Sequence, residues 1–166
     1  MSIGHEMRRL RAEHDALATL SRILMELVDR PHLPRPTELA SVRGMLRDTL
    51  VRHLKCEDWV LYPRLKASGD AALIRMACEF VAEVGDIAGD FQVYDSKWTE
   101  DLVAADWPGF CHETRCVLDL LAIRIERENE DLYPAVERLG VAEASLAKLD
   151  CQGRTDNFQL SATRQP

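Results

Sequence analysis

The sequence predicts an all-α protein, an antiparallel up-down four-helix bundle with a short extra C-terminal helix. Apolar residues recur at three- and four-residue steps through most of the 166-residue chain, which is the period of an amphipathic helix. No segment alternates between apolar and polar residues for long enough to indicate a strand. Breaks rich in Pro, Gly and Ser leave four long helical segments, and their short connections make successive helices antiparallel neighbours.

The first two helical segments are separated by the run from Pro31 to Pro36, which breaks the helical pattern. Thr37 is the expected N-cap of the second helix, because its hydroxyl can accept from free N–H groups of the first turn. The expected inner face of the first helix consists of Met7, Leu10, His14, Leu17, Leu24 and Val28. That of the second consists of Leu39, Val42, Leu46, Leu50, His53, Glu57 and Leu61.

The third helix is expected to begin after residues 68–70, where a glycine ends the preceding helix and Asp70 caps the next one. Asp106 is the expected cap of the fourth helix, with Pro108 in its first turn, and Gly140 its end. The expected inner face of the third helix consists of Leu73, Ala77, Phe80, Val84, Ile87, Phe91, Tyr94 and Trp98. That of the fourth consists of Phe110, Val117, Leu121, Arg124, Glu128 and Leu132.

The bundle is expected to occupy residues 1–150 as one domain. Within it, residues 141–150 have the pattern of a short extra helix. Residues 151–166 form a polar C-terminal tail, which is expected to be loose unless it is docked.

The composition is that of an acidic protein. Lys and Arg number 21 and Asp and Glu number 28, which gives a formal charge of −7. This acidity argues against nucleic-acid binding, which depends on clustered Lys and Arg, and against docking on an anionic membrane surface. No apolar stretch reaches the ~18 residues of a transmembrane helix, and no secretory signal is visible. We therefore expect a cytoplasmic protein whose five cysteines, without a Cys-x-x-Cys pair, are reduced thiols.

The chain contains an internal duplication. The motif Ala-Glu-His at 12–14 is matched by Ala-Glu-Val at 82–84. More sharply, His-x₃-Glu-x₃-Leu-Tyr-Pro at 53–63 is matched by Arg-x₃-Glu-x₃-Leu-Tyr-Pro at 124–134. Both prolines lie inside helical patterns, where proline normally costs about 3 kcal/mol. Two copies of a helix pair therefore account for the four helices.

Ionisable side chains lie on the inner stripes, where an unpaired charge is costly to bury. They are His14, His53, Glu57, Arg124 and Glu128. At 1.5 Å rise per residue, the two histidines each lie about 15 residues from the turn that joins their helices, so their depths match. His53 shares a helix face with Glu57, and Arg124 shares one with Glu128. Two imidazoles and two carboxylates inside a bundle suit a transition metal such as iron, manganese or zinc.

On these motifs the chain resembles the hemerythrin-like HHE cation-binding domain family, over residues 5–139. The resemblance implies that each half of the duplication supplies one histidine from its first helix and a His-x₃-Glu from its second. It also implies a non-haem di-iron centre whose two carboxylates bridge the irons. The residues that match the family's metal ligands are His14, His53, Glu57 and Glu128.

Two positions depart from the family pattern. Val84 and Arg124 stand where the second half of the family's site has its histidines. A valine cannot bind a metal and a guanidinium stays protonated, so both imidazoles for a second iron are missing. A full di-iron site, and the reversible oxygen carriage that needs it, is therefore not expected.

Two arrangements remain open for the other residues. In the first, one ion, non-haem iron or another divalent metal, binds His14, His53, Glu57 and Glu128, while Arg124 pairs with a carboxylate in place of the lost cation. In the second, no metal binds, the arginine balances the carboxylates and the histidines hydrogen-bond within the bundle.

The leading functional hypothesis is metal binding, with a role in metal, oxygen, nitric oxide or redox sensing, or in storage. The expected partners are then the metal ion and a small gas ligand. The alternative is a metal-free degenerate bundle that acts as an interaction or structural module, with a homodimer as one of its forms. An enzyme, such as a carboxylate-bridged oxidase, is the third hypothesis. The two missing histidines argue against it, and no catalytic residue is assigned.

The other histidines and the tryptophans are expected to lie outside the site. His5 is out of phase with the inner stripe of its helix, His32 lies among prolines, and His112 lies about 120° around the fourth helix from the inner stripe. The residues expected to pack in the core or at its rim are Trp59, Trp98 and Trp107.

Overall fold

The structure, a computed structural model, describes residues 3–84 and 87–140. Within these ranges the chain is helical apart from short connections and contains no strand, so the predicted all-α fold is confirmed. The predicted extra helix at 141–150 and the tail at 151–166 lie outside the described residues. In the part that the structure describes, no helix combines the length and the apolar character that crossing a membrane requires.

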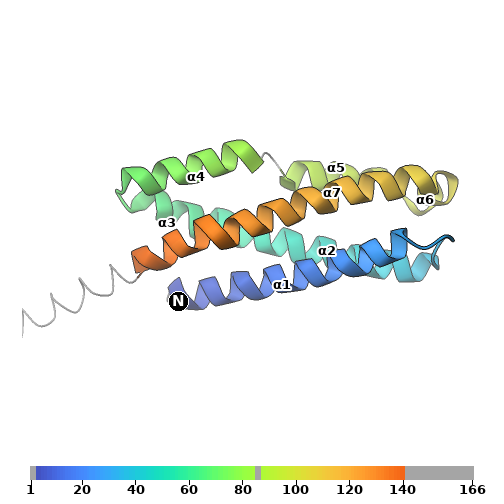
Figure 1. The fold of residues 1–166 in the computed structure, drawn as a ribbon, viewed down its shortest axis with the longest axis horizontal. Helices are drawn as coiled ribbons and strands as arrows, with labels where there is room; N and C mark the ends of the chain where they lie inside the picture. The colour runs from blue at the N-terminus through green and yellow to red at the C-terminus, as the bar shows by residue number, and fades with distance from the viewer. Residues whose placement is uncertain (1–2, 85–86, 141–166) are drawn as a thin grey trace, which may run out of the picture.

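Long helical rods lie side by side along the molecule (Figure 1). In chain order the elements are α1 (Ile3–Val28), α2 (Pro36–Cys56), η1 (Glu57–Leu61), α3 (Tyr62–Ala67), α4 (Ala71–Val84), α5 (Ile87–Lys97), α6 (Glu100–Ala105), α7 (Trp107–Arg127) and η2 (Glu128–Leu132). Helical structure continues over residues 133–140. The predicted third helix is thus described as two segments, α4 and α5, on either side of the two undescribed residues. Helix α1 packs against α2 and α7, and α5 packs against the same two helices.

The core consists of two apolar clusters with a polar layer between them. Along α1, Leu10 belongs to one cluster and Leu17 to the other, and His14 lies between them. On α7 and η2, Leu121 belongs to one cluster and Leu132 to the other, and Arg124 and Glu128 lie between them. All the inner-face residues predicted for the first two helices are buried. The inner stripes of the first two helices therefore meet as predicted, and the ionisable residues form one layer of the core. In the other two predicted stripes, Leu73 and Val117 are only partly buried, and the side chain of Val84 lies outside the described part of the structure.

Each proline of the duplicated motif follows a widened helical turn. Pro63 follows the π-helical turn η1, in which the Tyr62 N–H donates to the Glu57 carbonyl. Pro134 follows η2, in which the Tyr133 N–H donates to the Glu128 carbonyl. Proline has no N–H to donate, and its ring crowds the preceding turn. A π-helical turn of this kind is typical of functional sites, and here both turns begin at the glutamate of the motif.

One predicted cap is wrong and two are confirmed. Helix α2 begins after Arg35, with Pro36 in its first turn, so Thr37 already lies inside the helix. Proline's fixed φ suits the first helical position, and its missing N–H is one that needs no partner there. Asp70 accepts from the backbone N–H of Ala72 at 2.9 Å, and Asp106 caps α7.

The peripheral residues divide into confirmed and wrong predictions. His5, His32 and His112 are exposed, as expected. Trp98 is buried and Trp107 packs against the core. Trp59 is instead 76% exposed. It lies two residues after the inner-stripe residue Glu57, about 200° around the helix, so its side chain faces away from the core.

Two glycines provide a test of the α7 cap. The Gly109 N–H donates to Asp106 Oδ1 at 3.0 Å, and a Cβ on Gly109 would collide with that carboxylate. A Cβ on Gly44 in α2 would meet nothing closer than the end of Arg47, at 3.7 Å. We predict that Gly44→Ala raises the free energy of unfolding by about 0.5–1 kcal/mol. The free energy of unfolding of Gly109→Ala should be about 1 kcal/mol below that of Gly44→Ala, because the Asp106 cap is lost. Urea unfolding measures both, and equal gains would contradict the prediction.

Candidate metal centre

Four predicted residues meet in the polar layer, and we call them the His-Glu cluster. It consists of His14 on α1, His53 on α2, Glu57 at the start of η1 and Glu128 at the start of η2. All four side chains are buried, and each offers a ligand atom within 4.8 Å of the other three. Four separate elements therefore deliver one donor atom each to a single point in the core.

The donor atoms that face this point are two imidazole nitrogens and two carboxylate oxygens. His14 Nε2 lies 3.1 Å from His53 Nε2 and 2.9 Å from Glu128 Oε2. His53 Nε2 lies 3.5 Å from Glu57 Oε1 and 3.7 Å from Glu128 Oε2. Donors bound to one ion at about 2.0–2.2 Å are separated from their neighbours by about 3.0–3.5 Å. The four distances lie near this range, and the donor types suit one transition-metal ion.

Arg124 binds both carboxylates of the cluster from the opposite side. Its Nε donates to Glu128 Oε1 at 2.5 Å, and its Nη2 donates to Glu57 Oε2 at 2.9 Å. Only 8% of the arginine is exposed. Each carboxylate therefore has one oxygen on the guanidinium and the other directed toward the histidines. The predicted pairing of Arg124 with a carboxylate is found with both glutamates at once.

Val84, the other predicted departure from the family pattern, is the last residue of α4. Its side chain lies outside the described part of the structure. Its place next to the site stays a prediction from the duplicated sequence.

The electrostatics of the cluster favour the ionised form of Glu128. Burial favours a neutral Glu128, but hydrogen bonds from His14 and His53 and the charge of Arg124 prevail and lower the pKa of that carboxyl to about 2. Burial likewise opposes a charged His53, but Glu128 and Glu57 raise the pKa of its imidazole to about 9. Burial also acts against the charge of Arg124, yet the two glutamates raise the pKa of its guanidinium further. Ionised carboxylates are the form in which these groups bind metals.

Two residues of the site were missed by the sequence analysis. Asn129 Oδ1 lies 2.9 Å from His14 Nδ1, and an Nδ1–H donated to it leaves Nε2 free to bind a metal. The Tyr133 hydroxyl donates to Glu57 Oε1 at 2.9 Å and lies 3.1 Å from His14 Nε2, and its ring stacks on the His14 ring. Tyr133 could have been found as the tyrosine of the repeated motif. Asn129 carries no such signal, because a residue next to an inner-stripe position normally points elsewhere.

The comparisons with known proteins agree with the resemblance seen in the sequence. A family model described as the hemerythrin HHE cation binding domain matches residues 5–136. This range contains the whole His-Glu cluster and Arg124. No curated protein and no solved structure matches the chain.

Removing the buried arginine should destabilise the metal-free protein strongly. Arg124→Leu leaves two buried carboxylates without their cation, which we expect to cost about 3–5 kcal/mol. Arg22→Leu is the matched control, because Arg22 and Glu26 form an exposed ion pair with the same four-residue spacing at 2.7 Å. The control should change stability by less than about 0.5 kcal/mol. Urea unfolding with a chelator present measures both, and similar small losses would show that the buried pairs contribute little.

Proposed function

The chain belongs to the hemerythrin HHE cation-binding domain family, and we propose that it binds one transition-metal ion, iron, through the His-Glu cluster. We further propose a role in metal, oxygen, nitric oxide or redox sensing, or in storage. In this proposal the protein does not turn over an organic substrate. Bound iron would supply a redox-active centre able to take a diatomic ligand. The cytoplasmic location expected from the sequence is part of this proposal.

The observation that supports a single ion is the division of each carboxylate between two partners. Glu57 Oε2 and Glu128 Oε1 accept from Arg124. Glu57 Oε1 and Glu128 Oε2 remain on the side of the histidines. In the family, these carboxylates bridge two irons. In this chain, the guanidinium supplies the positive charge on one side, and donors for one ion remain on the other.

The burial of the site supports sensing or storage over catalysis. The histidine and glutamate side chains of the cluster are at most 2% exposed. An organic substrate therefore has no direct access to them, whereas a diatomic gas is small enough to reach them through side-chain motion. Tyr133 and Asn129 hold Glu57 and His14 in place by hydrogen bonds and do not offer an obvious acid–base pair for turnover.

The fold of the whole chain is part of the proposal. The contacts of α1 with α2 and α7, and of α5 with the same two helices, support an antiparallel up-down four-helix arrangement. We propose that residues 141–150 add the short extra helix predicted from the sequence.

A second candidate function is a metal-free interaction or structural module, including a homodimer. It is favoured by the hydrogen bonds that the cluster makes without an ion. His14 pairs with Glu128, and Arg124 pairs with both carboxylates. This candidate requires no metal in the purified protein and full folding in its absence.

Elemental analysis of the purified protein separates the two candidates. We predict about one metal ion per chain, the number that four protein donors hold in a closed site. His53→Ala should remove most of it, because it deletes one of two imidazole donors. His112→Ala is the control, because this imidazole is exposed and lies outside the cluster. Wild-type protein that is folded and free of metal would contradict the leading proposal and favour the second candidate.

Restoring the family's histidines should restore a second metal. We predict that the double variant Val84→His, Arg124→His binds about two ions per chain, because two imidazoles replace a valine and a competing cation. Arg124→His alone should bind fewer than two ions per chain, because one added imidazole holds a second ion only weakly. Metal content that stays near one in the double variant would show that the second half of the core no longer has the family geometry.

A further inference from the structure

Glu13 is a buried carboxylate that faces the side of His53 turned away from the His-Glu cluster. It lies on α1 next to His14 and is 8% exposed. Its Oε2 lies 3.4 Å from His53 Nδ1. Both atoms are buried, and neither has a hydrogen-bond partner. A buried acceptor and a buried ring nitrogen without partners are costly, and here they face each other across a single short gap.

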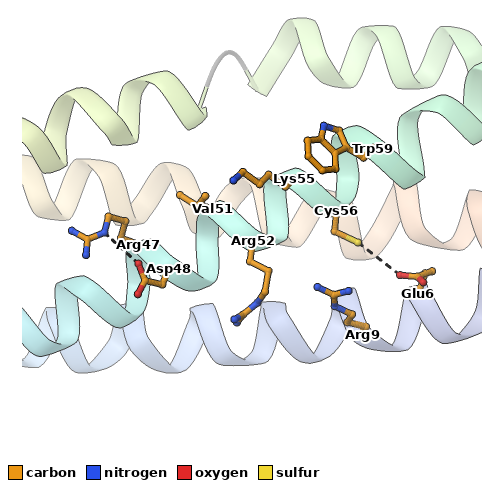
Figure 2. Close-up of a pocket in the computed structure, with 9 residues that line it drawn as sticks. All are labelled: Glu6, Arg9, Arg47, Asp48, Val51, Arg52, Lys55, Cys56 and Trp59. Carbon is orange, nitrogen blue, oxygen red and sulfur yellow. Dashed lines mark hydrogen bonds and ion pairs between the residues drawn. The ribbon is translucent and has the colours of Figure 1, made fainter.

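The other oxygen of Glu13 is held by two arginines from two helices. Arg9 Nε on α1 donates to Glu13 Oε1 at 3.2 Å, and Arg52 Nε on α2 donates to the same oxygen at 3.3 Å. Figure 2 shows Arg52 reaching from α2 toward α1, with Arg9 on the neighbouring helix. Both arginines line a surface cavity of about 740 Å³. One carboxylate oxygen is thus anchored at the surface, which leaves Oε2 directed at the imidazole.

A histidine can bind a metal through Nε2 only when its remaining proton is on Nδ1. In metal sites a carboxylate or carbonyl commonly accepts that proton, which fixes the tautomer and the ring orientation and makes the other nitrogen a better donor. A bond from His53 Nδ1–H to Glu13 Oε2 would satisfy both partnerless atoms. In the metal-bound protein, it would leave Nε2 as the nitrogen that binds the ion beside Glu57 and Glu128.

We therefore propose that Glu13 is a positioning residue for His53, holding it in the tautomer and orientation that bind the metal. The inference rests on the proposed function, because it assigns a role toward the ion held by the His-Glu cluster. The two imidazoles are then supported in different ways. His14 has the neutral amide of Asn129 behind it, whereas His53 has a charged carboxylate.

The competing explanation is that Glu13 only links α1 to α2 through its two arginines. Arg9 and Arg52 are about half exposed, and ion pairs with exposed partners contribute little to stability. Such a link would not change the affinity of a metal site or the protonation of an imidazole. Measurements of these two properties therefore separate positioning from a structural role.

The test uses the full chain titrated with zinc. Zinc is diamagnetic, and like iron it binds imidazole and carboxylate donors. Glu13→Ala should weaken zinc binding by about 10- to 100-fold. Glu13→Gln should fall between this variant and the wild type, because its amide oxygen can still accept the Nδ1 proton but carries no charge. Glu6→Gln is the matched control. Glu6 is a carboxylate on the same helix, 7% exposed, whose Oε2 accepts from the Cys56 thiol, and its change should leave zinc affinity within about twofold.

¹⁵N-edited NMR of the zinc-loaded protein detects the imidazole N–H of His53 directly. This signal would not change if Glu13 had only a structural role. The His53 Nδ1–H should be a downfield, exchange-protected signal in the wild type, the Glu13→Gln variant and the Glu6→Gln variant. In Glu13→Ala this signal should be lost. Thermal melting of each variant shows that it is folded, and the glutamine variant keeps the test decisive if the alanine variant does not fold.

The outcomes of the two proposals are distinguishable. Wild-type protein that binds no zinc overturns the metal-binding function, and the role of Glu13 falls with it. Zinc binding that is equally tight in the wild type and both Glu13 variants, with an unchanged imidazole signal, overturns only the positioning role. Weakened binding together with loss of the Nδ1–H signal supports both.

Discussion

The interaction on which the rest of the site depends is the fork of Arg124 between Glu57 and Glu128. A guanidinium is planar, and its N–H groups point in fixed directions, so Nε and Nη2 take one oxygen from each carboxylate. The remaining oxygens are thereby directed toward His14 and His53. Two buried carboxylates side by side repel each other, and the guanidinium between them offsets that repulsion. The same contact thus maintains the charge of the layer and decides which face of it can receive a metal.

The polar layer is also where the helices are locked together. Asn129 follows Glu128 on η2 but contacts His14 on α1, and Glu13, next to His14, faces His53 on α2. A residue adjoining a donor on one element thus supports a donor on another. Shifting one helix by a single turn would break several of these contacts together, whereas the apolar clusters on either side would tolerate some sliding. Polar contacts of this kind specify register more sharply than they add stability.

Several features could not be read from the sequence because they depend on local departures from a regular helix. The widened turns η1 and η2 interrupt the regular helix, and Asn129, the second residue of η2, lies within reach of His14. The repeated prolines signalled a disturbance at both places but not its form. The start of α2 was misplaced by two residues because Pro36 and Thr37 both carry signals for a helix start. A side-chain cap and a proline in the first turn compete when they adjoin.

The sequence by itself determined the all-helical fold, the membership of the inner faces and the convergence of His14, His53, Glu57 and Glu128 on one layer. It could do so because helical periodicity and rise convert spacing directly into face and depth. Only the tertiary structure decided how the charges pair: that Arg124 binds both carboxylates, and that a tyrosine and an asparagine complete the layer. Pairing depends on the rotation of each helix and on side-chain directions across three or four elements, and no spacing within a single chain segment contains that information.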